Sequence, residues 1–220
     1  MAMGIFGFSK SRMVDSSSAL PGRDSPVLPE PRIHAVLGTS LTGPWPDGTQ
    51  VIHLAMGCFW GAEEIYWRLP GVVATSAGYM GGITPNPTYE EVCTGMTGQT
   101  ETVMVAYDPS VISTYDILKA FWENHDPTQG YRQGNDTGTQ YRSAIYYSTD
   151  EQRELIERTR DAYAAVISQR GYPAITTEIE PAADHPYFLA EDYHQQYLYK
   201  NPNGYRCHAN TGLALPALAS

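Results

Sequence analysis

From residue 50 onward, apolar residues recur at two spacings, one typical of strands and the other typical of helices. Short apolar or alternating runs predict strands at residues 51–57, 72–79, 101–109, 140–148 and 174–181. Apolar residues repeated every three or four positions predict helices at residues 58–69, 114–125, 150–170 and 187–200. Strands interleaved with helices predict an α+β fold, a two-layer α/β sandwich. We expect its central sheet to be mixed or antiparallel, because the spacings are uneven and the loops are long.

Local signals mark where the predicted helices begin and end. Ser113 and Thr149 each stand three residues before a side chain that can complete a capping box. Pro70-Gly71 stops the first helix and Gly171 stops the third. The stretches 80–92 and 126–139 are predicted loops, the first rich in glycine and proline and the second polar.

The chain divides into three parts by composition. Residues 1–45 are rich in proline and serine and show little periodicity, so we expect an extension that wraps the surface or stays partly loose. Residues 46–200 carry the regular pattern and are predicted to form a single catalytic domain. Residues 201–220 are rich in glycine and alanine, which indicates a flexible C-terminal tail.

Composition narrows the classes of function. The net charge of −10 argues against a broad nucleic-acid surface. No apolar run is long enough to span a membrane, and the N-terminus lacks the order of a secretory signal. Three cysteines are too few, and odd in number, for a disulfide framework. We therefore expect a cytoplasmic protein, and we expect any cysteine with a role to be a reactive thiol rather than part of a structural disulfide.

One cysteine stands at a position suited to reactivity. Cys58 lies where a predicted strand becomes a helix, and the unpaired N–H groups of a helix's first turn favour the thiolate. Gly57 allows a sharp turn there, and Phe59 and Trp60 can wall an apolar pocket beside the sulfur. The alternative is a buried structural cysteine covered by core aromatics.

The segment "GCFWG" at residues 57–61 resembles the signature of class A peptide methionine sulfoxide reductases. The resemblance runs from Val51 to Cys207 and continues through residues 78–101, 126–146, 175–179 and 188–205. It implies a ferredoxin-like plait and the reduction of methionine S-sulfoxide, free or in oxidised proteins, as repair of oxidative damage. It also implies thioredoxin as the reductant and no cofactor. We expect a monomer.

The chemistry needs a nucleophile, an acid and donors to the sulfoxide oxygen. Cys58 supplies the first, and the resemblance places the acid at Glu101 and the oxygen-binding tyrosines at Tyr89 and Tyr141. Glu101 can act as an acid near pH 7 only if burial raises its pKa. The alternatives are a solvated carboxylate at a strand end and tyrosines that only pack.

The resemblance assigns further substrate contacts. Phe59 and Trp60 would hold the S-methyl group, and Asp136 would lie at the edge of the site, where it orients water or the substrate backbone. The alternative for Asp136 is a turn-forming residue. His194 lies in a family motif but is predicted to pack on a helix, with contact to the pocket rim as the other reading.

The two remaining cysteines receive different predictions. Cys93 is predicted to be a small apolar filler. The family commonly uses tail cysteines to resolve the oxidised nucleophile, so the resemblance implies a disulfide between Cys58 and Cys207. The tail beyond Cys207 contains no second cysteine, which excludes relay to one. A stray tail thiol is the alternative.

Rival functions remain open at this point. A cysteine hydrolase would need a histidine base at Cys58, and His53 or His125 could serve. A thioredoxin-like role is disfavoured because no C-x-x-C motif is present. A metal site is weakly indicated, since His185, His194, Cys207 and His208 lack the paired spacing of zinc ligands. No nucleotide-binding motif occurs. A module that only captures oxidised methionine is the non-enzymatic alternative.

Overall fold

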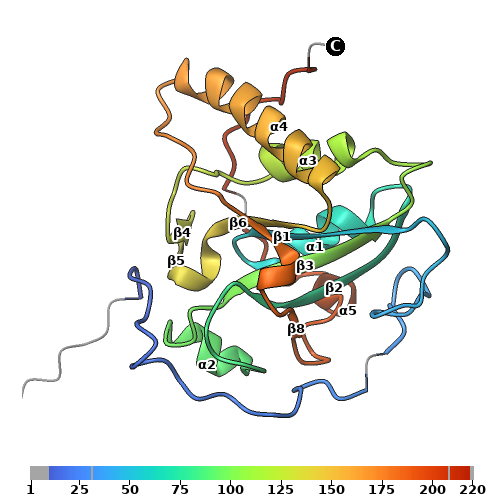
Figure 1. The fold of residues 1–220 in the computed structure, drawn as a ribbon, viewed down its shortest axis with the longest axis vertical. Coiled ribbons are helices and arrows are strands. Elements are labelled where there is room, and N and C mark those ends of the chain that lie inside the picture. Colours follow the sequence, from blue (N-terminus) through green and yellow to red (C-terminus); the bar gives the residue numbers. More distant parts are fainter. Residues whose placement is uncertain (1–9, 31, 208, 219–220) are drawn as a thin grey trace, which may run out of the picture.

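The computed structural model describes residues 10–218 except 31 and 208, and it contains a six-stranded sheet with helices packed on it (Figure 1). The strand order is β7-β6-β1-β3-β2-β8. The strands are β1 (Gln50–Met56), β2 (Val72–Met80), β3 (Thr100–Tyr107), β6 (Ser143–Tyr147), β7 (Glu178–Pro181) and β8 (Phe188–Leu189). Neighbours pair antiparallel except β6 with β7, which are parallel. The predicted two-layer α+β fold with a mixed sheet is confirmed, whereas its ferredoxin-like detail stays a prediction.

The helices α1 (Phe59–Trp67), α3 (Thr114–Glu123) and α4 (Asp150–Ser168) lie on one face of the sheet. The two short strands β4 (Arg132–Gln133) and β5 (Asp136–Thr137) form a separate hairpin, and the other helices are α2 (Tyr89–Cys93), α5 (Tyr197–Lys200), η1 (Thr139–Tyr141) and η2 (Ala182–Asp184). Ser113 and Thr149 cap α3 and α4, each accepting a hydrogen bond from the backbone N–H three residues on, as predicted. Alternate residues of β1, among them Ile52 and Leu54, point into the main core beneath α1, α3 and α4.

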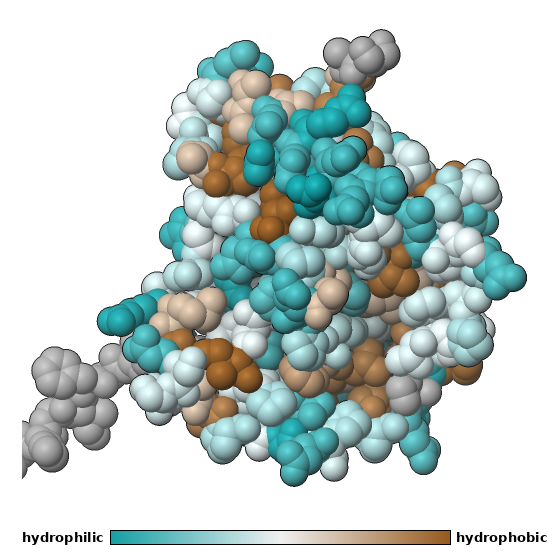
Figure 2. Space-filling model, in the orientation of Figure 1, coloured by the Kyte–Doolittle hydropathy of each residue, from teal (hydrophilic) through white to brown (hydrophobic). Residues whose placement is uncertain are grey.

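The other face of the sheet carries small side chains and no long helix. Ala55, Ala74, Ala106 and Ala144 are fully buried there, which lets irregular chain approach closely. Trp45 of the N-terminal segment is among the residues that pack against them. On the face shown in Figure 2, hydrophobic residues form small groups among hydrophilic ones rather than one broad patch.

Two elements predicted near the C-terminus, at residues 174–181 and 187–200, differ from the structure. The helix predicted at 187–200 is wrong over most of its length, because β8 and turns occupy it and only Tyr197–Lys200 is helical. The physical reason is a pair of buried amides that bond distant partners. Gln195 exchanges hydrogen bonds with the backbone of Ala77, and Gln196 adopts the left-handed conformation (φ 47°). The strand predicted at 174–181 is limited to Glu178–Pro181.

The helix α2 was not predicted, since its residues fell within a predicted loop. Thr88 and Glu91 form a full capping box, with the Thr88 hydroxyl accepting from the Glu91 N–H and the Glu91 carboxylate accepting from the Thr88 N–H. That pattern is readable in the sequence, but the surrounding glycines and prolines obscured it. The element positions Tyr89 at its first residue.

The N-terminal segment wraps the domain, and its course along the lower edge is visible in blue in Figure 1. The Lys10 carbonyl accepts a hydrogen bond from the Thr139 N–H, and Arg23 pairs with Glu91 at 2.8 Å. Further along, the Ala35 N–H donates to the Gln196 side chain at 3.1 Å. Residues 1–9 lie outside the described residues. These contacts hold residues 10–35 against the domain, and the division of the chain at residue 45 stays a prediction.

The C-terminal segment also packs on the domain. Leu215 is 4% exposed within the main core, and its N–H donates to Glu123 at 2.8 Å. The Tyr163 hydroxyl hydrogen-bonds Thr211 on the same path. Flexibility of residues 201–220 stays a prediction, and any large movement of the tail has to break these contacts. None of the helices in the described ranges is long and apolar enough to cross a membrane.

Candidate active site

Cys58 occupies the N-cap position of α1, directly after β1, as the sequence predicts. Gly57 makes the turn possible with φ 91°, a conformation that side chains disfavour. A Cβ at Gly57 would also lie 2.7 Å from the Gln133 side chain, so the position admits no larger residue. The turn leaves Cys58 buried, at 8% exposure.

The pKa of the Cys58 thiol lies well above its usual value, because burial and then the Glu101 carboxylate disfavour the thiolate. The N–H groups of Trp60 and Gly61 lower the pKa, which is the effect expected at a helix start. The sequence predicts easier ionisation from that effect alone, and burial outweighs it here. The resting site therefore holds Cys58 as a thiol at neutral pH.

Glu101 lies on β3 with 1% exposure, in the apolar strand where the sequence places it. One carboxylate oxygen accepts a hydrogen bond from the Phe59 N–H at 3.0 Å, and the other, Oε1, has no partner among the described residues. Burial raises the Glu101 pKa to about 8; the Phe59 N–H lowers it and the nearby Asp136 charge raises it. The carboxyl group is thus mostly protonated at neutral pH and has a free oxygen to present.

Two tyrosine hydroxyls lie close enough to the Glu101 carboxyl group for its charge to raise their pKa values. Tyr89 begins α2 and Tyr141 ends η1. Burial, and secondly the Glu101 charge, hold the pKa of each hydroxyl far above its usual value. Both hydroxyls therefore keep their protons and can donate hydrogen bonds to an oxygen atom near Glu101.

An aromatic cluster lies against the start of α1. The Phe59 ring stacks on Tyr89 with centroids 6.4 Å apart, and Trp60 stacks on Tyr197 at 3.8 Å. The Trp60 indole N–H donates to His194 Nδ1 at 3.1 Å, so His194 packs on α1, which is the reading that the sequence favours. These rings form an apolar cluster that begins at the residue after Cys58, and apolar surfaces of this kind suit a methyl group.

Sequence reasoning missed three residues that contact members of the candidate site. Tyr197 stacks on Trp60, and its place three residues after His194 was the available signal. Glu191 accepts hydrogen bonds from the Tyr89 N–H at 2.8 Å and the Tyr79 hydroxyl at 3.0 Å, so it holds α2 in place. The third residue is Tyr205, whose hydroxyl donates a hydrogen bond to Asp136.

Asp136 lies at the margin of the site on β5 and is partly exposed. It accepts a hydrogen bond from the Tyr205 hydroxyl at 3.1 Å, and burial raises its pKa. Its charge acts on Glu101 and Cys58, which places it near both groups. Its place at the edge of the substrate site and its role there both stay predictions.

A cavity of about 200 Å³ adjoins Cys58, and Cys207 lines it from the tail. The Cys207 thiol is partly buried and lies 3.6 Å from the Gln133 carbonyl. Cys93, by contrast, does not line this cavity; it is half-buried, interacts with the Tyr89 hydroxyl, and burial raises its pKa. The geometry thus brings Cys207, rather than Cys93, to a space shared with Cys58.

The two histidines that could act as the base of a cysteine hydrolase contact other residues instead of Cys58. His125 is fully hydrogen-bonded, to the Phe121 carbonyl at 2.7 Å and to Ser143 at 2.8 Å. The His53 ring packs on Tyr187 at 4.8 Å on the opposite face of the sheet. Within residues 10–218, leaving out 31 and 208, no histidine hydrogen-bonds Cys58, and no group of three or more potential metal ligands occurs. His208 lies outside the described residues.

Comparison with known proteins matches residues 50–218 to the family model described as peptide methionine sulfoxide reductase. The chain is 58% identical to the peptide methionine sulfoxide reductase MsrA of Salinispora arenicola, over 94% of each chain. Among solved structures, methionine sulfoxide reductase A of Corynebacterium diphtheriae superposes with a TM-score of 0.82 at 50% identity, covering 94% of this chain and 100% of that one. Reduced Mxr1 from Saccharomyces cerevisiae gives a TM-score of 0.64 at 36% identity, over 74% and 91%.

Proposed function

The chain belongs to the peptide methionine sulfoxide reductase family, and from this premise we propose how its own residues carry out the reaction. It is a thiol-dependent enzyme that reduces methionine sulfoxide to methionine. The observation that carries the assignment of roles is the buried Glu101, whose pKa of about 8 keeps a proton available beside Cys58. A hydrolase has no use for an acid so placed without a histidine base.

In the proposed reductive step, the Cys58 thiolate attacks the sulfoxide sulfur while Glu101 protonates the oxygen. Tyr89 and Tyr141 donate hydrogen bonds to that oxygen, and Phe59 and Trp60 hold the methyl group. The oxygen then moves to the Cys58 sulfur, and both the sulfoxide sulfur–oxygen bond and the bond between the two sulfur atoms break, which leaves methionine and a Cys58 sulfenic acid. Protons balance, because the proton lost by the Cys58 thiol replaces the one given by Glu101.

We expect the enzyme to favour the S epimer at sulfur. The aromatic cluster and the tyrosine hydroxyls offer different chemistry to the two sides of the sulfoxide, so only one epimer directs its oxygen at the donors and its methyl group at the rings. Turnover of the purified S epimer should exceed that of the R epimer by at least about 100-fold, since misdirected polar groups are strongly discriminated. Equal turnover of the two epimers would contradict the assignment.

For the second half of the reaction we propose that Cys207 attacks the Cys58 sulfenic acid. The product is a disulfide, one water molecule leaves, and thioredoxin then reduces the disulfide by thiol exchange. Support comes from the cavity that both cysteines line. Cys93 lies away from that cavity, beside Tyr89.

Cys207→Ser should release one methionine per enzyme molecule and then stall when thioredoxin is the reductant. The first turnover needs only Cys58 and its acid, whereas the second needs the disulfide. Consumption of NADPH in a coupled thioredoxin assay measures the stall, and quenched-flow measurement of methionine counts the first turnover. Dithiothreitol should restore turnover, because a small thiol can attack the sulfenic acid directly.

Two results would contradict this role for Cys207. One is full thioredoxin-driven turnover in Cys207→Ser. The other is a peptide in the oxidised wild type that joins Cys58 to Cys93 instead of Cys207, as identified by mass spectrometry after proteolysis.

We further propose the setting in which the enzyme works. Its substrates are oxidised proteins and free methionine sulfoxide, its recycling partner is thioredoxin, and the external thiols take the place of a cofactor. Residues 46–200 act as the single catalytic domain of a cytoplasmic monomer, between the extension at 1–45 and the tail at 201–220. The contacts that bind both end segments to the domain support one cooperative unit.

A further inference from the structure

The residue before Cys207 is tied to the helix that begins at Cys58. Arg206 contacts the Glu64 carboxylate with two nitrogen atoms, Nε to Oε2 at 2.7 Å and a terminal nitrogen to Oε1 at 3.0 Å. Both side chains are partly shielded, with 29% exposure for Arg206 and 12% for Glu64. This two-point geometry fixes orientation as well as distance. The contact lowers the pKa of Glu64, so the carboxylate is charged at neutral pH.

Arg206 also organises the chain that leads to Cys207. Its third nitrogen donates to the Pro202 carbonyl at 2.9 Å and to the Gly204 carbonyl at 3.3 Å. A Cβ at Gly204 would lie 2.7 Å from the Tyr197 ring, so this turn lies directly against the aromatic cluster. Residues 202–206 are therefore folded around the guanidinium group rather than loose.

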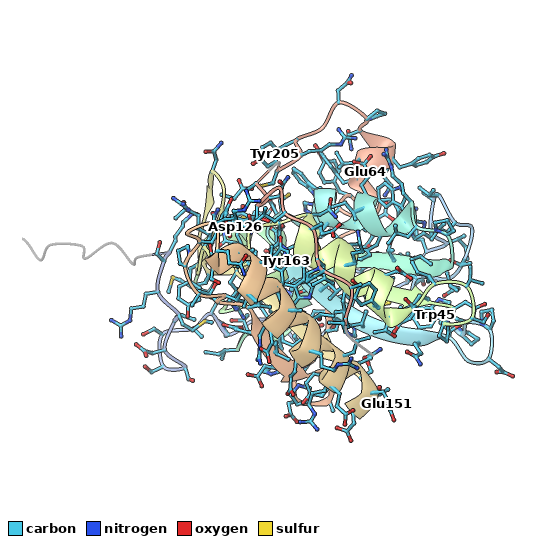
Figure 3. All side chains as sticks on the ribbon, turned by 90° about the horizontal axis from the view of Figure 1, so that it is seen from above. Trp45, Glu64, Asp126, Glu151, Tyr163 and Tyr205 are labelled. Atoms are coloured by element: carbon cyan, nitrogen blue, oxygen red, sulfur yellow. The ribbon has the colours of Figure 1, made fainter. Side chains whose placement is uncertain are left out.

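The ion pair borders the space that the two cysteines share. Glu64 and Arg206 line the same cavity of about 200 Å³ as Cys58 and Cys207. Figure 3 shows the labelled Glu64 and Tyr205 at one edge of the molecule, opposite Glu151. Since adjacent Cα atoms are about 3.8 Å apart, fixing Arg206 leaves Cys207 little freedom beyond rotation of its own backbone and side chain.

We propose that the Arg206–Glu64 ion pair is a latch that positions Cys207 for attack on the Cys58 sulfenic acid. The inference rests on the proposed role of Cys207. The latch acts on the condensation, in which the sulfur–sulfur bond forms as water leaves, and it does not touch the sulfoxide. Arg206 and Glu64 are thus positioning residues, and their contribution is to raise the effective concentration of one thiol near the other.

The structure supplies a matched pair of variants. Arg206 and Arg68 both contact Glu64, Arg68 at 2.7 Å, but Arg68 belongs to the helix side and not to the tail. Arg206→Gln leaves Glu64 paired with Arg68, and Arg68→Gln leaves it paired with Arg206. Each substitution removes one positively charged side chain that contacts the Glu64 carboxylate. Only Arg206→Gln also releases the tail.

The test measures the two chemical steps separately in one experiment. Reduced enzyme is mixed with excess methionine sulfoxide without reductant, and samples are quenched for released methionine and for remaining thiols. Arg206→Gln should release its first methionine at the wild-type rate and form the disulfide at least about tenfold more slowly, the scale expected when a reacting group loses its alignment. Cys58 sulfenic acid should accumulate and be trapped by dimedone. Arg68→Gln should match the wild type, and Arg206→Lys, which keeps the charge without the two-point contact, should be intermediate.

Equal rates of disulfide formation in Arg206→Gln and the wild type would overturn the latch, as would equal slowing in Arg206→Gln and Arg68→Gln. Slowing of methionine release in Arg206→Gln would overturn it too, because the effect would then be general. In each case Cys207→Ser still accumulates sulfenic acid and the proposed function stands. If Cys207→Ser accumulates none, the role of Cys207 fails and the latch fails with it.

Discussion

Cys58→Ser should abolish the release of methionine, including the first turnover. A serine hydroxyl stays neutral near pH 7 and is far less nucleophilic toward sulfur than a thiolate, so we expect the single-turnover rate to fall by roughly 10⁴-fold or more. Quenched-flow measurement of methionine from a fixed excess of enzyme over substrate gives this rate directly. The site is otherwise preserved, because serine fits the same N-cap position.

The matched control is Cys207→Ser, which removes the other thiol of the shared cavity and should keep the first turnover. Thermal unfolding of the two variants separates loss of chemistry from loss of structure. Methionine release by Cys58→Ser at a rate near that of the wild type would contradict the proposed mechanism. It would also favour a module that binds oxidised methionine and leaves its reduction to an external thiol.

Glu101→Gln should slow the reductive step by about 10²–10⁴-fold, the usual contribution of a positioned acid. Glutamine keeps the shape of the side chain, and its amide oxygen can still accept from the Phe59 N–H. What it lacks is the proton that the sulfoxide oxygen needs. Single-turnover rates measure the effect, with Glu90→Gln as a control that changes an unburied carboxylate on the neighbouring helix α2. An unaltered rate would mean that the proton comes from elsewhere, and Tyr89 or Tyr141 would be the next candidates.

The pH dependence offers a second readout for the same residue. The Glu101 pKa is raised to about 8, so the acid form is present below that pH and is lost as the pH rises through it. Above pH 8 two effects oppose each other in the wild type, because ionisation of Cys58 raises the single-turnover rate and loss of the Glu101 proton lowers it. The rate should therefore rise less steeply with pH than the ionisation of the thiol alone would predict. Glu101→Gln has no acid to lose and should show only the rise that belongs to the thiol. Parallel pH profiles in the two proteins would contradict the assignment.

The β-strands and long helices were predictable because their spacing signals are local. The alternation in residues 101–109 and the caps at Ser113 and Thr149 need no information from distant parts of the chain. The segment 187–200 failed for the opposite reason. Its spacing imitates a helix, but buried hydrogen bonds from Gln195 to Ala77 and from Gln196 to Glu63 decide its conformation. Such long-range polar contacts do not alter the spacing of apolar residues, so they cannot be predicted from it.

In the candidate site, too, features set by local sequence were predictable and features set by distant residues were not. Cys58 could be placed at a helix start from "GCFWG", and its environment could not. The net upward shift of its pKa comes from burial and from Glu101, which is 43 positions away in the chain. Tyr205 and Glu191 escaped notice because each acts through a partner on another element, Asp136 in one case and Tyr89 in the other.

Contacts between the two ends of the chain have a consequence for how the protein is made. Among the described residues, the buried Glu63 carboxylate accepts hydrogen bonds from Thr75 and from Gln196, and Leu215 packs into the main core. A ribosome adding about 5–20 residues per second needs roughly 7–30 s to pass from Cys58 to Gln196. Throughout that interval Cys58 lacks the burial that raises its pKa in the folded protein, so a larger fraction of its thiol is ionised. We therefore expect this thiol to be oxidised more easily on the nascent chain than in the folded enzyme.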